Sequence, residues 1–172
     1  MTGEWSRSVV TVGSTLLGVS VGALLQYLGS AAQIKRQQAE RARIMLREKL
    51  EELSSTIEQF RDGVNTGAMS LLEYSITGKL LEEETGMKKF PRLEMLVRFY
   101  APSLLAELES LREVWGIWGR AVEGLVDARS RKLGDSETRK AMGLVFSGRD
   151  EISQRCDGLQ STLVKMLHET LS

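Results

Sequence analysis

Cysteine and histidine are almost absent from this chain of 172 residues, which contains only Cys156 and His168. One cysteine excludes an intrachain disulfide, and cysteine usage therefore does not imply an oxidising compartment. A structural or catalytic zinc usually needs three or four converging N, S or O ligands, and a di-iron bundle needs Glu-x-x-His pairs. Because neither pattern occurs, we expect no metal and no cofactor. We interpret Cys156 as a buried, inert thiol and His168 as a solvated or helix-end residue.

Proline, aromatic residues and net charge are also scarce. The chain has two prolines and 6% aromatic residues, and its 23 basic and 23 acidic side chains give a formal net charge of zero. Without an overall positive field there is no reason to expect nucleic acid as a partner. No glycine-rich phosphate-binding loop is present. The abundance of Leu, Glu, Arg and Ala favours helix, so we predict an all-α protein that is not an enzyme.

One long segment lacks charged side chains altogether. Residues 9–32 contain no Asp, Glu, Lys, Arg or His. As a helix with a rise of about 1.5 Å per residue, this run extends roughly 36 Å, enough to cross a hydrocarbon core of about 30 Å. We predict a transmembrane anchor within residues 1–33, spanning about residues 8–32. A cleaved signal peptide is the competing interpretation, because small residues follow at Ser30 to Ala32, but the apolar run is longer than an ordinary h-region.

The charges flanking the run predict its orientation. From Lys35 to Lys49 the sequence has six basic residues against Glu40 and Glu48, whereas only Arg7, offset by Glu4, precedes the run. Because positive charge stays on the cytoplasmic side, we expect the N-terminus outside the cell (inner) membrane and residues 34–172 in the cytoplasm. The basic residues that follow the run should also lie against anionic lipid headgroups.

Small and polar residues form a stripe along the predicted span, at successive intervals of four. A GxxxG unit lies within it, and small residues of this kind let two membrane helices pack closely. We therefore predict a homo-oligomer whose transmembrane face consists of Ser14, Gly18, Gly22, Gln26 and Ser30. In an alternative interpretation, a ring of copies encloses a wet pore lined by Ser14, Gln26 and Ser30, with Thr11 and Thr15 at the pore edge.

Apolar residues at heptad spacing recur in three later segments. This spacing is typical of helices that pack against one another. The three sets are Leu46, Leu50, Leu53, Ile57, Phe60 and Val64; then Leu104, Leu108, Leu111, Trp115, Trp118, Val122 and Leu125; then Met142, Val145, Ile152, Cys156, Leu159, Leu163 and Met166. Together they predict that residues 34–172 form an elongated antiparallel helical bundle.

Two courses of the chain would bury these residues. In the first, residues 34–84 form one helix leading away from the membrane, residues 91–130 return with a kink or restart near Pro102, and residues 136–171 lead out again. That course places Arg129, Arg131, Lys132, Arg139 and Lys140 beside Lys35 and Arg36 at the lipid surface. In the second, the chain turns near Gly63 to Gly67 to give four helices, with Lys88, Lys89 and Arg92 at the membrane instead.

The pair Trp115 and Trp118 is a candidate for close helix packing, because Gly116 and Gly119 bare the backbone beside both indoles. The alternative is a partner groove built on these rings. The whole pattern indicates a non-enzymatic, single-span membrane protein that self-associates and docks a cytoplasmic protein partner or acts as a scaffold. A pore-forming or membrane-perturbing effector of a bacterial defence or exclusion type is the alternative function.

Overall fold

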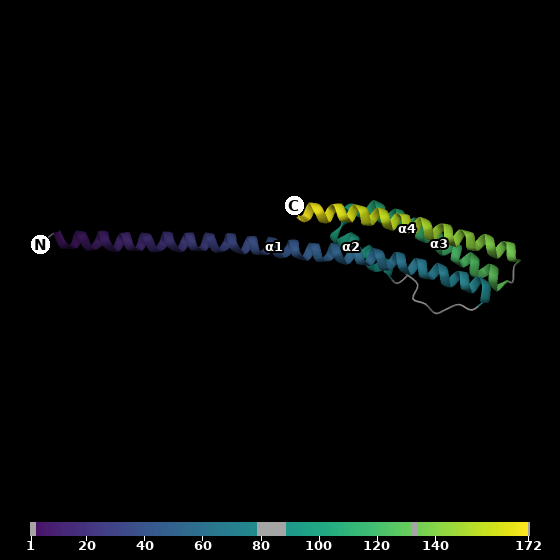
Figure 1. The fold of residues 1–172 in the computed structure, drawn as a ribbon. Helices are drawn as coiled ribbons and strands as arrows, with labels where there is room; N and C mark the ends of the chain where they lie inside the picture. The colour runs from purple at the N-terminus through teal and green to yellow at the C-terminus, as the bar shows by residue number, and fades with distance from the viewer. Residues whose placement is uncertain (1–2, 79–88, 132–133, 172) are drawn as a thin grey trace. The chain divides into compact units, whose positions relative to one another are not determined.

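A computed structural model describes the backbone of residues 3–78, 89–131 and 134–171, and the side chains of residues 33–78, 89–131 and 134–169. Within this part of the chain all regular structure is helical (Figure 1). The elements are α1 (Gly3–Thr77), α2 (Phe90–Tyr100), the short 3-10 helix η2 (Pro102–Leu104), α3 (Leu105–Ser130) and α4 (Asp135–Leu171). The chain divides into two compact units, Met1–Met45 and Leu46–Ser172. The expectation of an all-α fold is thereby confirmed.

Helix α1 passes through the glycine-containing stretch at Gly63 to Gly67 without a break. Val64 and Ala68 are buried there, at 1% and 0% exposure, and extend the apolar seam by another turn. Burial of that seam outweighs the cost of the glycines, roughly 0.5–1 kcal/mol each in a helix interior. The expected turn in this stretch is therefore wrong. Four α-helices are present among the described residues, as that alternative required, but the divisions lie elsewhere.

Gly78 ends α1, earlier than the expected residue 84. Its φ of +75° lies in the left-handed region, and its N–H donates to the carbonyl of Tyr74 at 2.8 Å. This satisfies one of the carbonyl groups left over at a helix C-terminus. Only glycine adopts this conformation without strain.

A matched pair of glycine replacements tests this ending. Gly78→Ala should lower the free energy of unfolding by about 1 kcal/mol or more, because the left-handed region is strained for a side chain with a Cβ. Gly119→Ala in α3 should raise it by about 0.5–1 kcal/mol, because no atom lies within 4 Å of the Cβ position there. Thermal unfolding followed by circular dichroism measures both. Equal effects at the two positions would contradict the argument.

Pro102 reverses the chain rather than kinking a single helix. The N–H of Ala101 donates to Val97 O at 3.0 Å, and η2 follows at once with Pro102 in its first turn. At the end of α2, the Nζ of Lys49 lies 6.0 Å from the ring centroid of Tyr100. At the end of α3, Arg129 donates to the carbonyl of Ile76 at 3.2 Å. Helix α2 is thus antiparallel to α1, and α3 is parallel to it.

Helix α4 runs back along both α1 and α3. Arg61 donates to Asp157 at 2.9 Å and Gln160 donates to Ser54 at 2.5 Å, which fixes α4 antiparallel to α1. The expected course, out along residues 34–84, back along 91–130 and out again, is therefore wrong. Its error was to treat residues 91–130 as one return helix, when Pro102 makes them an antiparallel pair of segments.

The three heptad seams do form the core of the unit Leu46–Ser172. All predicted members of the seams are buried or partly buried there, joined by Leu93, Leu96 and Val97 from α2. The residues at 0% exposure are Leu53, Phe60, Ala68, Leu93, Leu96, Val97, Ala101, Leu104, Leu108, Leu111, Leu125, Val145, Ile152, Cys156, Leu159 and Leu163. Heptad spacing alone therefore identified most of the buried surface of α1, α3 and α4.

Candidate functional site

Four aromatic rings meet at the centre of the bundle, from α1, α2 and α3. Phe60 contacts Phe90 and Trp115 with ring centroids 5.5 and 5.1 Å apart, and Trp115 stacks on Trp118 at 5.0 Å. Trp118 is 1% exposed and donates from its indole N–H to the carbonyl of Val145 at 3.1 Å. A buried indole with its polar atom satisfied is a core residue. The predicted partner groove on the two tryptophans is therefore absent, because Trp118 does not reach the surface.

Gly116 and Gly119, beside the tryptophans, are not where a neighbouring helix approaches closely. The Cβ position of Gly119 has no atom within 4 Å, and that of Gly116 meets only the guanidinium of Arg120 at 3.8 Å. The close contact is instead at Gly148 of α4, where a Cβ would lie 3.0 Å from Cδ1 of Trp118. Helix α4 is continuous through this glycine. Only the packing of α3 on α4 shows why glycine fits there.

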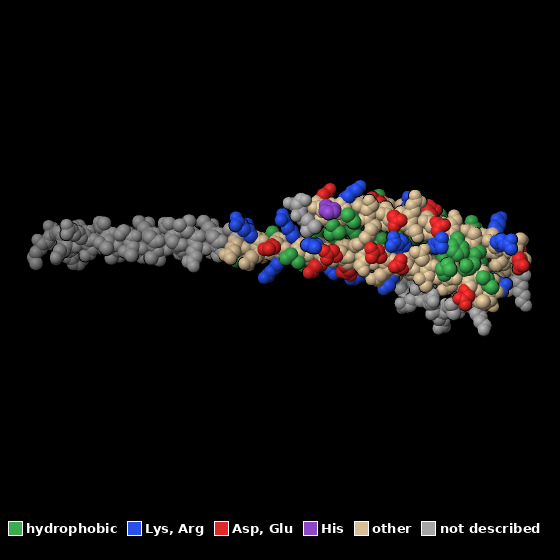
Figure 2. All heavy atoms as spheres, viewed as in Figure 1, with side chains coloured by type: hydrophobic (Ala, Val, Ile, Leu, Met, Phe, Trp, Pro, Cys, Tyr) green, Lys and Arg blue, Asp and Glu red, His purple; other side chains and the backbone are tan. Residues whose placement is uncertain are grey.

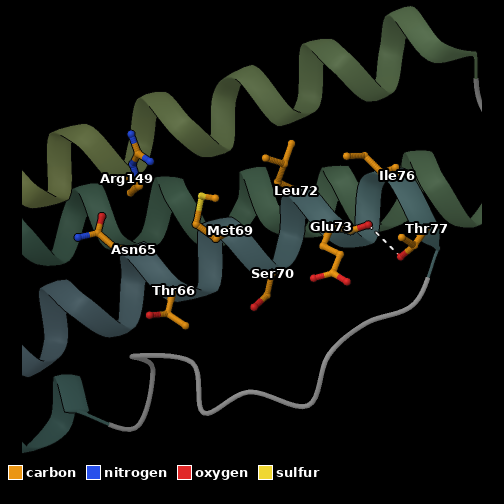
Figure 3. Close-up of a pocket in the computed structure, with 9 residues that line it drawn as sticks. All are labelled: Asn65, Thr66, Met69, Ser70, Leu72, Glu73, Ile76, Thr77 and Arg149. Carbon is orange, nitrogen blue, oxygen red and sulfur yellow. Dashed lines mark hydrogen bonds between the residues drawn. The ribbon is translucent and has the colours of Figure 1, made fainter.

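An open groove lies along the last turns of α1, facing α4 (Figure 3). Met69, Leu72 and Ile76 project from α1 toward α4, and Arg149 reaches in from α4. The groove encloses about 610 Å³ and is lined by Asn65, Thr66, Met69, Ser70, Leu72, Glu73, Ile76, Thr77 and Arg149. Sequence reasoning missed this site. The sequence contained one indication of the groove: apolar residues continue along α1 beyond Val64, the last residue of the first heptad set.

The groove is apolar where it is most open. Met69 is 55% exposed and Ile76 is 71% exposed. Figure 2 shows apolar side chains gathered near this end of the unit, beside charged groups. Arg149 is held by its neighbours, since its guanidinium lies 4.6 Å from the ring of Phe146 and its Nε donates to Asp150 at 2.9 Å. The groove thus combines exposed apolar side chains from α1 with polar neighbours and one cation held in place.

Ion pairs attach the short helix α2 to its neighbours. Arg92 of α2 pairs with Glu52 of α1, which also accepts from Lys49 at 2.7 Å, and Arg112 of α3 pairs with Glu94 of α2. The hydrogen bonds from Lys49 and Arg92 hold the pKa of Glu52 below its ordinary value, and that from Arg112 does the same for the pKa of Glu94. These pairs are at the surface, so they orient α2 more than they stabilise it.

The two rare chemical groups of the chain lie apart. Cys156 is at 0% exposure, and burial raises the pKa of its thiol to about 12. His168 is exposed near the end of α4, with its side chain at the surface (Figure 2). Among the residues that the structure describes, no group of three or more His, Cys, Asp or Glu side chains could hold a metal ion. The expectation that Cys156 is buried is confirmed.

Cys156 should be unreactive in the folded protein. Because burial raises the pKa of its thiol to about 12, the reactive thiolate is scarce at any pH below that value. We expect no labelling by a disulfide reagent at pH 8 in the native state and one thiol per chain in denaturant. Stoichiometric labelling of the native protein would show that α4 opens around this residue.

The basic residues predicted to lie together at the lipid surface belong to two different units. Lys35 and Arg36 belong to the unit Met1–Met45 and are exposed. In the other unit, Arg129 of α3 lies beside the C-terminal end of α1, where it donates a hydrogen bond to the carbonyl of Ile76. Arg131 pairs with Asp127 at 2.8 Å. Lys132 lies outside the described residues. The course of the chain on which the predicted grouping depended is not the observed one.

The predicted transmembrane face lies outside the residues whose side chains are described, and so does the possible pore edge at Thr11 and Thr15. The face comprised Ser14, Gly18, Gly22, Gln26 and Ser30. The backbone of these residues belongs to α1. In the part of the chain with described side chains, no helix combines the length and the apolar character needed to cross a membrane.

Comparison with known proteins adds no family. No family model, curated protein or solved structure matches this chain. The proposed function therefore depends on the residues and their arrangement alone.

Proposed function

We propose that this chain is a non-enzymatic, single-span membrane protein whose transmembrane helix self-associates and whose helical bundle binds or scaffolds another protein. The observation that carries the proposal is the run at residues 9–32, which has no charged side chain and lies within one α-helix, Gly3–Thr77. Roughly 36 Å of helix matches the thickness of a bilayer core. The positive-inside rule then places the bundle in the cytoplasm.

Two features of the bundle support a binding role. The groove at the end of α1 leaves Met69 and Ile76 more than half exposed, and adjoining apolar side chains in a groove offer a surface to the apolar side chains of a partner. The candidate reactive groups point away from catalysis, because the only cysteine is buried and the only histidine is exposed at the end of α4. A cytoplasmic protein is therefore the proposed partner of the bundle.

Alkaline extraction and protease access together test the anchor. The full chain should stay with the membrane pellet at high pH, because extraction of a spanning helix would expose its apolar run to water. Protease added outside intact cells should leave residues beyond Lys35 uncut. Release by alkali would overturn the anchor, and external cleavage beyond Lys35 would overturn the orientation alone.

The pore alternative has a separate test. A ring of copies lined by Thr11, Thr15 and Gln26 would conduct ions, whereas helices packed through their small residues enclose no water. We expect no ion flux above the empty-liposome level when the full chain is reconstituted. Sustained flux that disappears when Gln26 is replaced by leucine would favour the pore instead.

A further inference from the structure

The segment of α1 at residues 33–45, called the stem below, lies in the unit Met1–Met45. Every one of its side chains is exposed. Its large apolar residues are exposed as well: Ile34 and Ile44 are each 53% exposed, and Met45 is 56% exposed. The stem is continuous with the rest of α1, so its helix does not depend on burial of these side chains, and its whole surface is open to a partner.

The charge of the stem indicates what that partner is. The stem contains one acidic residue, Glu40, and four basic residues, Lys35, Arg36, Arg41 and Arg43. None of these four cations has an ion pair with any described residue. The pattern changes just beyond the stem, where Arg47 pairs with Glu51 at 2.8 Å and Lys49 pairs with Glu52 at 2.7 Å. Figure 2 shows basic side chains on more than one side of the stem. The described stem therefore carries an excess of three positive charges without an ion pair, and an anionic partner would neutralise them.

In the proposed oligomer the stems of neighbouring copies have like charge, so a second copy does not neutralise them. Anionic phospholipids fit better, for a geometric reason that rests on the proposed anchor. With a rise of about 1.5 Å per residue, Lys35 and Arg36 lie roughly 5–6 Å beyond residue 32, within a headgroup layer about 5–7 Å thick. Arg41 and Arg43 lie roughly 14–17 Å beyond it, about one Debye length outside that layer.

We propose that the stem binds the headgroups of anionic phospholipids, with Lys35 and Arg36 in direct contact and Arg41 and Arg43 acting through the screened field. Juxtamembrane basic residues attract anionic lipid in this way, and the attraction weakens within a Debye length of the surface. The contribution of the four cations is therefore graded along the stem. This gradation distinguishes a lipid surface from a polyanion that would bind all four cations alike.

Lipid selectivity of the reconstituted full chain tests the proposal. The chain is placed in phosphatidylcholine bilayers containing a minority of phosphatidylglycerol, and spin-labelled forms of both lipids report their relative enrichment at the protein. The wild type should enrich the anionic lipid, and raising the salt from about 0.1 to about 1 M should reduce this enrichment. Replacing Lys35, Arg36, Arg41 and Arg43 with glutamine should bring the ratio close to one. The pair at 35 and 36 should account for more of the loss than the pair at 41 and 43.

The bundle offers a matched control with the same change in charge. Arg120, Arg139, Lys140 and Lys165 are exposed and have no ion pair among the described residues, so their replacement by glutamine should leave the lipid ratio unchanged. An equal fall in both quadruple variants, or no fall in the stem variant, would overturn the proposal. Loss of binding to polyuridylate by the stem variant, with lipid selectivity intact, would assign the stem to nucleic acid instead. Alkaline extraction of the same samples tests the anchor separately: a chain that remains in the pellet but shows no lipid preference contradicts only this inference.

Discussion

Replacing Gly18 and Gly22 together with isoleucine should convert the full chain from an oligomer to a monomer in mild detergent. Both glycines lie on the predicted stripe of small residues, where the absence of side chains lets two helix backbones approach each other. Two branched side chains would force the helices apart and separate Gln26 from its partner amide, a contact that contributes about 0.6–2 kcal/mol in membranes. Sedimentation velocity or crosslinking in detergent measures the change.

The same span provides a control with similar added bulk on the opposite face. Gly13 and Ser20 lie on the opposite side of the helix from Gly18 and Gly22, so isoleucine at both positions should leave the oligomer intact. A monomer in both double variants would mean that bulk anywhere disrupts the span. An unchanged oligomer in the Gly18 and Gly22 variant would refute the packing face while leaving the anchor untouched.

Trp118→Ala should be the most destabilising single change in the bundle, with a loss of about 3–5 kcal/mol in the free energy of unfolding. The indole is 1% exposed, stacks on Trp115 and packs against the bare backbone of Gly148, so its loss leaves a cavity that α3 and α4 cannot easily fill. The carbonyl of Val145 also loses its hydrogen-bond donor. Denaturant unfolding of the full chain in detergent, followed at the helical circular-dichroism signal, measures the loss.

The adjacent residue in α3 supplies the control for that change. Ile117 is 53% exposed, so Ile117→Ala removes another large apolar side chain from the same helix turn without opening the core. Its effect should lie within about 0.5 kcal/mol of zero. Comparable losses at the two positions would mean that the stacked aromatic cluster is not what holds α3 to α4.

The periodicity of apolar residues predicted the buried faces of this protein because burial along a helix depends mainly on spacing. Leu50, Leu53 and Ile57 follow one another at intervals of three and four, and all three are buried. The same reasoning identified Cys156 as a core thiol. It did not predict that α1 ends at Gly78, within the segment 34–84 expected to be one helix, because a positive φ does not change the apolar spacing.

The direction of each helix could not be derived in the same way. A helix has the same apolar spacing whether it runs away from α1 or back along it, so residues 91–130 were compatible with a single return segment. Pro102 signalled a break, but a proline break is compatible with a kink or with a full reversal. The contacts of Tyr100 with Lys49 and of Arg129 with Ile76 show that the chain reverses.

The sequence by itself determined the helical class, the apolar faces of α1, α3 and α4, and the uncharged run that underlies the proposed anchor. These properties are local, since they depend on residue spacing within a single helix. Only the tertiary structure decided that α2 folds back on α1, that Gly148 is the glycine against which Trp118 packs, and that Met69 and Ile76 border an open groove. Each of these depends on which helices become neighbours, and neighbours are chosen by the combined packing of all four helices.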